Sequence, residues 1–208
     1  MTQASQTPAD DLAYVRRLAE SGARAPLIGG RFMAWWGFIL TIAYVAHYFA
    51  LKGMIGDGSG SIFGIIWIGF SVAGVGGQIL LARGMPPKAG EGSAGNRASR
   101  SAWTAAACAI GSMVIGCIIA ARTGAGPATF DWIVPVAFSV YACALIVTGA
   151  LSGDRIIVAA GGGAVAMVGL FTALILHSDR YLLAAGGVAA TVLLPGLLLL
   201  SREPRTQD

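Results

Sequence analysis

Six uninterrupted apolar runs dominate this chain of 208 residues. None of them contains Asp, Glu, Lys or Arg. A hydrocarbon core of about 30 Å is crossed by a helix of about 20 apolar residues, and in lipid a helix satisfies its own backbone hydrogen bonds. Each run is therefore predicted to be a transmembrane helix. The runs cover residues 32–51, 62–81, 102–121, 132–151, 156–176 and 181–200.

The composition agrees with a membrane protein. Hydrophobic residues make up 56% of the chain and charged residues 12%, whereas soluble globular proteins carry about 25% charged residues. The basic isoelectric point, 9.3, comes from residues between the runs rather than from a clustered basic face. No nucleic-acid-binding motif accompanies them, so the lipid bilayer is an expected partner and a nucleic acid is not.

The distribution of Lys and Arg predicts the orientation, because cytoplasmic segments of membrane proteins carry an excess of both. With a cytoplasmic N-terminus, the outer side keeps only Lys52, Arg122 and Arg180. The inner side then carries Arg16, Arg17, Arg24, Arg31, Arg83, Lys88, Arg97, Arg100, Arg155, Arg202 and Arg205. We therefore expect both termini in the cytoplasm of a bacterium and the protein in its cytoplasmic (inner) membrane. The first apolar run is expected to act as an uncleaved anchor.

Residues 1–30 are predicted to form a cytoplasmic amphipathic helix and a basic hinge. Thr7 and Pro8 suit the start of a helix, and Gly22 suits its end. Such a segment either lies on the inner headgroups, as basic amphipathic helices beside membranes usually do, or docks a membrane or cytosolic protein through residues 8–24. The residues expected at this lipid or partner surface are Leu12, Val15, Arg16, Arg17 and Leu18.

Short connections predict the layout of the transmembrane domain, residues 31–201. Connections of four residues at 152–155 and 177–180 favour antiparallel neighbours, so we expect three antiparallel hairpins. Residues 84–100 are rich in Gly, Pro and Ser and are predicted to be a mobile inner loop. Residues 202–208 are expected to be a cytoplasmic tail.

Small residues spaced by four predict where helices approach closely in lipid. Such spacing occurs in the third, fifth and sixth runs, which are therefore expected to form the centre of the bundle, with the aromatic first run facing lipid. Pro195 is expected to bend the sixth helix. The residues that carry the spacing are Ser112, Gly116 and Ala120, Gly161, Val165 and Gly169, and Gly187, Thr191 and Pro195.

The polar residues named here as candidates inside the runs are uncharged. Intramembrane carboxylates or basic groups usually mark ion or proton paths, and the runs have none. Gln78, Ser139 and Thr148 are the candidates for a polar function within the membrane. Cys108 and Cys117 lie on opposite faces of one predicted helix and cannot share a metal, and Cys143 is alone on another.

His47, His177 and Asp179 are candidates at the outer face. With Asp57 and Asp131 they could bind a divalent metal or respond to external pH, because His titrates near ~6.5. The simpler interpretation takes Thr129 with Asp131, and Ser178 with Asp179, as N-caps and dipole partners of the fourth and sixth helices. No metal and no cofactor are therefore expected.

The function that best fits these patterns is a non-enzymatic interaction or regulatory component. The runs lack buried charge, no nucleophile elbow, His-Glu-x-x-His or Cys-x-x-Cys pattern is present, and organised polar chemistry lies outside the bilayer. The alternative is a small transporter or channel for an uncharged or amphipathic solute, acting alone or as a homo-oligomer whose interface supplies the path. The sequence matches no known family motif residue by residue.

Overall fold

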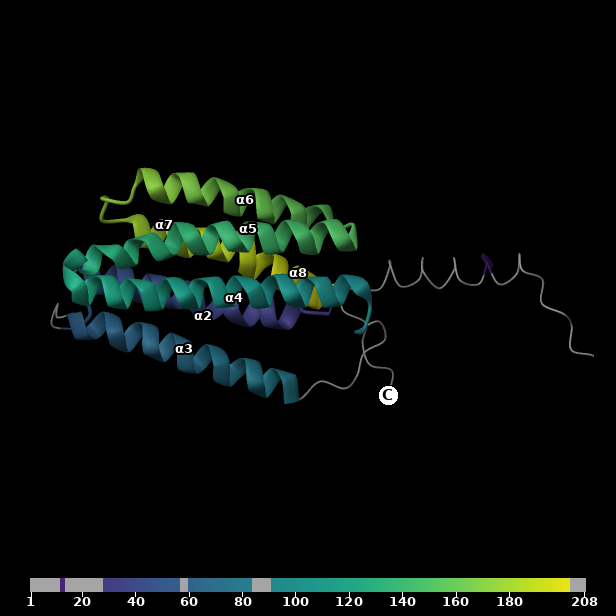
Figure 1. The fold of residues 1–208 in the computed structure, drawn as a ribbon, viewed down its shortest axis with the longest axis horizontal. Coiled ribbons are helices and arrows are strands. Elements are labelled where there is room, and N and C mark those ends of the chain that lie inside the picture. Colours follow the sequence, from purple (N-terminus) through teal and green to yellow (C-terminus); the bar gives the residue numbers. More distant parts are fainter. Residues whose placement is uncertain (1–11, 14–27, 57–59, 84–90, 203–208) are drawn as a thin grey trace, which may run out of the picture.

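The computed structural model describes residues 12–13, 28–56, 60–83 and 91–202 (Figure 1). Every regular element in these ranges is a helix. Helices α2, Gly30–Leu51, and α3, Gly60–Arg83, are followed by α4, Ala94–Ala120, which continues in a π-helical turn η1, Ala121–Ala125. A short 3-10 helix η2, Pro127–Trp132, leads into α5, Ile133–Ser152. Helix α6, Arg155–Ala173, precedes a last segmented helix made of α7, Arg180–Val188, η3, Ala189–Leu193, and α8, Leu194–Arg202.

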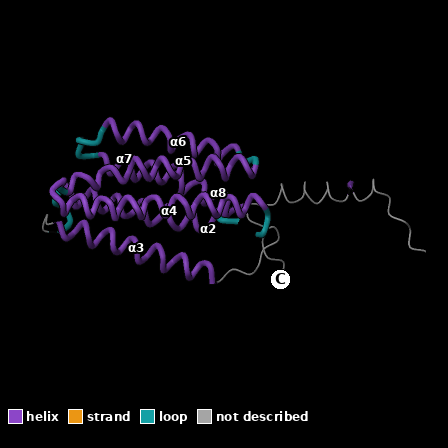
Figure 2. Tube along the Cα trace, in the orientation of Figure 1, coloured by secondary structure: helices purple, strands orange, loops and turns teal. Residues whose placement is uncertain are grey.

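The described residues contain six helical segments that are long and apolar enough to cross a membrane. The prediction of an all-helical, multi-pass membrane protein is thereby confirmed. The segments run along one common long axis (Figure 2). We call the end where Gly30 and Arg202 lie the terminal end. The opposite end, which carries residues 52–56, 121–132 and 174–179, is the distal end.

The core lies among α2, α5, α6 and the segmented last helix. Its largest fully buried side chains are Phe138, Leu145, Ile157, Phe171 and Val188. Helices α5 and α6 share the most extensive interface, and α2 packs against α7 and α8 from the other end of the chain. The expectation that the first helix faces lipid is therefore wrong, because Trp35, Trp36 and Tyr44 contact other helices, although Phe38 is 50% exposed.

Glycines explain how α2 comes so close to η3 and α8 of the segmented last helix. A Cβ on Gly37 would lie 2.7 Å from the backbone of Leu193, and one on Gly196 would lie 2.5 Å from Ala34 N. In contrast, nothing lies within 4 Å of a Cβ built on Gly116. The expectation that the third helix belongs to the centre is thus also wrong. Small residues spaced by four permit a close approach, but a partner helix has to be there.

Helices α3 and α4 lie at the edges. Gly74 is the one buried residue of α3, and α2 is the element against which α3 packs most. Helix α4 packs mainly against α5. Figure 1 shows α3 inclined away from the other helices at the border of the bundle.

The second half of the predicted loop 84–100 is helical, so that prediction is wrong for residues 94–100. Ser93 caps α4, since its Oγ accepts a hydrogen bond from Asn96 N at 3.2 Å. Asn96 Oδ1 accepts from Ile28 N at 3.0 Å and ties α4 to the segment before α2. A serine followed by Ala-Gly-Asn resembles a loop by composition, but here the serine starts a helix. Residues 84–90 lie outside the described ranges.

The last span is interrupted ahead of Pro195, in the region where the sequence predicts a bend. The π-helical turn η3 ends two residues before this proline. Proline lacks the N–H that an α-helix would pair with the carbonyl of residue 191, so the hydrogen-bond ladder shifts there. Thr191 is buried and donates its hydroxyl hydrogen to Gly187 O at 2.7 Å.

Candidate functional site

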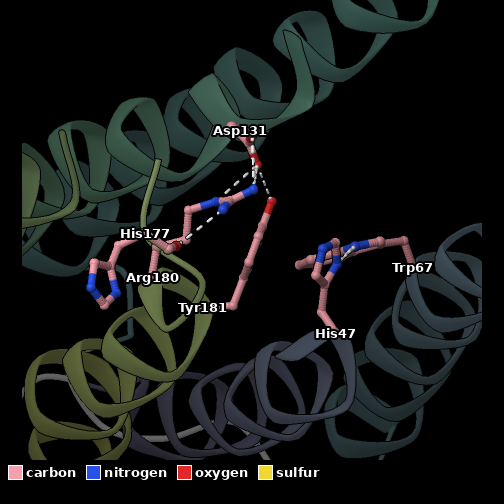
Figure 3. Close-up of polar contacts among 6 residues, drawn as sticks. All are labelled: His47, Trp67, Asp131, His177, Arg180 and Tyr181. Atoms are coloured by element: carbon pink, nitrogen blue, oxygen red, sulfur yellow. Dashed lines mark hydrogen bonds and ion pairs between the residues drawn. The ribbon is translucent and has the colours of Figure 1, made fainter. Parts of the chain in front are cut away.

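The richest set of polar side chains in the described residues lies at the distal end (Figure 3). Asp131 comes from η2, and Arg180 and Tyr181 open α7. His47 lies in the last turn of α2, and Trp67 lies in the distal half of α3. Four elements that are far apart in sequence therefore meet in one cluster, which we call the distal network.

Arg180 and Asp131 form the ionic centre of the distal network. Arg180 Nη2 donates to both carboxylate oxygens of Asp131 at 3.1 Å, and Nε donates to Oδ1 at 3.3 Å. Their side chains are only 16% and 18% exposed. Charge-assisted, two-pronged pairs of this kind are among the stronger protein hydrogen bonds. Arg180 Nη1 also donates to His177 O at 3.1 Å, which fixes the turn before α7.

Tyr181 connects this ion pair to His47. Its hydroxyl donates to Asp131 Oδ1 at 2.6 Å. Its ring stacks on the His47 imidazole, with 3.8 Å between centroids and 25° between planes. Phe63 of α3 lies against the same imidazole at 4.6 Å between centroids. The imidazole is thus held between aromatic rings of two helices.

Trp67 determines which nitrogen of His47 carries the proton. Trp67 Nε1 donates to His47 Nδ1 at 3.0 Å. An indole N–H is only a donor, so Nδ1 accepts, and the ring in this arrangement is the neutral form with its proton on Nε2. A proton on Nδ1 would break the bond to Trp67. His47 is therefore a positioned, neutral imidazole rather than a free interfacial side chain.

A second, exposed group lies beside the distal network. Lys52 Nζ contacts Asp179 Oδ1 at 3.1 Å and donates to Ser178 Oγ at 2.9 Å. His177 Nδ1 lies 3.8 Å from Asp179 Oδ2. The hydrogen bond from Lys52 is the main cause that lowers the pKa of Asp179 below its ordinary value of 3.8. These contacts link residues 52 and 174–179 at the surface of the distal end.

The structure separates the predicted outer-face candidates. His47 belongs to the distal network, whereas His177 and Asp179 belong to the exposed group, and the His177 ring points away from Tyr181 (Figure 3). In the described ranges no three His, Cys, Asp or Glu side chains are arranged to hold a metal ion. The interpretation of Asp131 as a helix cap is wrong, because its carboxylate pairs with Arg180 and Tyr181 and no side chain caps α5. Asp179 precedes α7 without a side-chain cap bond.

The intramembrane polar candidates do not meet. Trp36 Nε1 donates to Gln78 Oε1 at 2.7 Å between α2 and α3. Ser139 Oγ donates to Pro135 O of its own helix at 2.8 Å. Thr148 is buried and shares a hydrogen bond of 3.0 Å with Ser99 of α4. Each of the three side chains makes a local hydrogen bond, and the three define no common path.

Of the five residues expected at the N-terminal surface, the structure describes Leu12, which is 72% exposed. The other four lie outside the described residues. Sequence reasoning missed Arg180, Tyr181 and Trp67 as members of a site. In the sequence, Asp131 and Arg180 each lie at the end of a connection between two apolar runs. This position indicates that both lie near the distal end, but it does not predict that they pair.

The chain matches no protein-family model, no curated protein and no solved structure.

Proposed function

We propose that the chain is a non-enzymatic interaction or regulatory component of a bacterial cytoplasmic membrane, which acts by binding a membrane or cytosolic protein through residues 8–24. One observation carries this proposal. The polar side chains of the described spans are engaged in short, separate hydrogen bonds, as for Gln78, Ser139 and Thr148. Such bonds join helices or satisfy one helix, and they supply neither a nucleophile with its base nor a continuous hydrophilic path.

The charge at the two ends supports cytoplasmic termini. The terminal end carries six described arginines, against three basic residues at the distal end. This asymmetry agrees with the excess of basic residues on the cytoplasmic side of membrane proteins. The six arginines are Arg31, Arg83, Arg97, Arg100, Arg155 and Arg202. Contacts of α2 with α3 and of α4 with α5 are compatible with the hairpin layout that forms part of this proposal.

The N-terminal segment supplies the expected contact surface. On a helical wheel Leu12, Val15 and Leu18 fall on one side. Leu12 is exposed, and an amphipathic helix can dock into a partner's groove through its apolar side. The same surface fits lipid headgroups, so the experiment has to separate the two.

The test is affinity purification from native membranes in a mild detergent, comparing the full chain with a chain that lacks residues 1–25. We expect one protein to co-purify with the full chain and to be lost with the shortened one. In the full chain, replacement of Leu12, Val15 and Leu18 by Ser should abolish the association. Glu20→Gln, on another side of the wheel, is the matched control and should retain it. Equal recovery of the partner with all four chains would refute the proposal.

Transport of an uncharged or amphipathic solute is the second candidate. One observation favours it: the last span is interrupted at η3, which contains the buried Thr191. Interrupted helices often form binding sites in transporters. In reconstituted vesicles, Thr191→Val should then alter solute flux, whereas loss of residues 1–25 should not. Equal flux into protein-loaded and empty vesicles across a solute panel would exclude this candidate.

A further inference from the structure

Helix α3 is attached to α2 differently in its two halves. In the half nearer the terminal end, Trp35 Nε1 donates to Gly74 O at 3.2 Å. Trp36 Nε1 donates to Gln78 Oε1 at 2.7 Å. Gly74 and Gly77 leave room for these two indole rings, which a Cβ on either glycine would meet. An indole, an amide and a backbone carbonyl do not titrate, so the attachment of the terminal half does not depend on pH.

The distal half of α3 is attached through an imidazole. Trp67 Nε1 donates to His47 Nδ1 at 3.0 Å, and Phe63 lies against the same ring. The ring of Trp67 also packs edge-on against Tyr44 of α2. A histidine nitrogen accepts a hydrogen bond only while it carries no proton. The attachment of the distal half therefore depends on the protonation state of His47.

Protonation of His47 would remove this hydrogen bond and place two donors against each other. In the neutral ring Nε2 already carries a proton, so an added proton goes to Nδ1, the nitrogen that accepts from Trp67. The stacking of the imidazole on Tyr181 does not require a free lone pair, and an aromatic face also attracts a cation. His47 therefore stays with α7, and Trp67 is the partner that has to leave.

The surroundings of His47 do not neutralise a charge on it in the closed arrangement. Burial is the main factor that opposes this charge, whereas Asp131 of η2 favours it and Arg180 of α7 opposes it. Asp131 is already held by Arg180 and by the hydroxyl of Tyr181. Tyr44 on α2 is uncharged, and α3 contributes only aromatic rings. A proton on His47 is therefore best accommodated when the helices separate and water reaches the ring.

We propose that His47 is an acid-sensitive latch for α3: protonation of its Nδ1 releases Trp67, and the distal half of α3 then tilts away from α2 while the terminal half stays attached. Gly74, the buried residue of α3, is the pivot, because the terminal attachments begin there. Ile65 lies nine residues before Gly74, about 13.5 Å along the helix, so a tilt of about 20° moves Ile65 by about 5 Å. The latch is independent of the N-terminal contact proposed above.

Distances between spin labels on the full chain in lipid nanodiscs test the latch. The labels join exposed positions of α3 and α6, which lie at opposite borders of the bundle (Figure 1). The distal pair is Ile65→Cys with Leu170→Cys, and the terminal pair is Ile79→Cys with Ile156→Cys. The native cysteines are first removed by Cys108→Ala, Cys117→Ser and Cys143→Ala. Between about pH 7.5 and about pH 4, the distal pair should gain a population about 5 Å longer, and the terminal pair should not change. No change in the distal pair, or equal changes in both pairs, would overturn the proposal.

Three variants of the distal pair separate His47 from other groups that titrate at low pH. His47→Gln keeps an amide oxygen that can accept from Trp67 but takes up no proton, so the distance should stay short at both pH values. His177→Gln changes the exposed histidine, is the matched control and should show the full acid-induced change. Trp67→Phe removes the donor and should abolish the dependence on pH. Carboxyl groups, including that of Asp131, still titrate in all three variants. An acid-induced change that persists in His47→Gln or in Trp67→Phe would therefore belong to them and refute the latch.

Discussion

Tyr181 donates its hydroxyl hydrogen to Asp131 Oδ1 over 2.6 Å, although 50 residues separate the two in sequence. The same carboxylate holds Arg180, and the same phenol ring stacks on His47. One residue of α7 thus joins the turn before α5 to the end of α2. Through Trp67 the connection extends to α3, the helix with the fewest other contacts in the bundle. The distal network therefore holds together the end of the bundle opposite the termini.

Asp131 should be the most sensitive position of this network. Asp131→Ala leaves the Arg180 guanidinium half-buried without its counter-charge. Removing one partner of a buried pair costs about 3–5 kcal/mol, and partial exposure of this pair should bring the loss of unfolding free energy to about 2–3 kcal/mol. The measurement is reversible unfolding in mixed micelles. A chain that lacks both Asp131 and Arg180 side chains should recover part of the loss. Additive losses would contradict a direct pair.

Trp67→Phe should loosen the distal half of α3. The variant keeps an aromatic ring against Tyr44 and Phe70 but removes the N–H that His47 Nδ1 accepts. Hydrogen bonds between membrane helices contribute about 0.6 to 1.7 kcal/mol, and we expect a loss in that range. Hydrogen exchange of α3 amides provides the readout. Trp103→Phe is the matched control, because Trp103 contacts Tyr141 by its ring. Equal effects of the two changes would mean that only ring volume matters.

Ser93→Ala should fray the start of α4. The serine hydroxyl accepts from Asn96 N, and loss of such a cap typically costs about 1 kcal/mol. Amide exchange at residues 94–100 should accelerate, with little change in α5 or α6. Ser201→Ala, whose hydroxyl only donates to Leu198 O near the end of α8, is the control. Unchanged exchange at residues 94–100 would show that contacts with Asn96, rather than the cap, hold this turn.

The six spans could be predicted from sequence because each apolar run carries its own signal, independent of its neighbours. The centre of the bundle could not. Ser112, Gly116 and Ala120 have the spacing of a close contact, yet α4 leaves Gly116 facing open space. Gly37 lies in the aromatic first run, which was expected to face lipid, yet it lies against the backbone of Leu193. Which helices are neighbours depends on all six packing together.

The distal network was unpredictable for a related reason. Asp131 directly precedes a helix, where a cap is the usual role of an aspartate. The carboxylate instead pairs with Arg180, 49 residues later, because the fold brings the start of α7 within hydrogen-bond reach and the charge-assisted contact is the stronger one. Sequence rules such as helix capping compare only partners that are close in sequence. They give no information on a partner as distant as Arg180. His47 and Asp179 were recognised as candidates, but their assignment to separate groups required the fold.

Acidification should affect the exposed group in a defined direction. The pKa of Asp179 is lowered below 3.8, mainly by the hydrogen bond from Lys52. A carboxyl group with a lowered pKa stabilises the folded state above its unfolded pKa, and this contribution is lost as the pH falls through the folded value. The contact between residues 52 and 179 should therefore persist to below pH 3.8. Infrared titration of labelled aspartate should show the pKa of Asp179 rising in Lys52→Gln. An unchanged titration curve would contradict the pairing.

Gly37→Ala should separate α2 from η3, the middle part of the segmented last helix. The added Cβ would lie 2.7 Å from both N and Cα of Leu193, and backbone atoms cannot yield as a flexible side chain does. Overpacking of this kind costs about 1–3 kcal/mol of unfolding free energy. Gly111→Ala is the matched control, since it adds the same methyl group to a helix interior where nothing lies within 4 Å. Alanine also favours a helix over glycine by about 0.5–1 kcal/mol, so the control should unfold at the same or a higher denaturant concentration. Equal stability of the two variants would contradict the close contact between Gly37 and the backbone of Leu193.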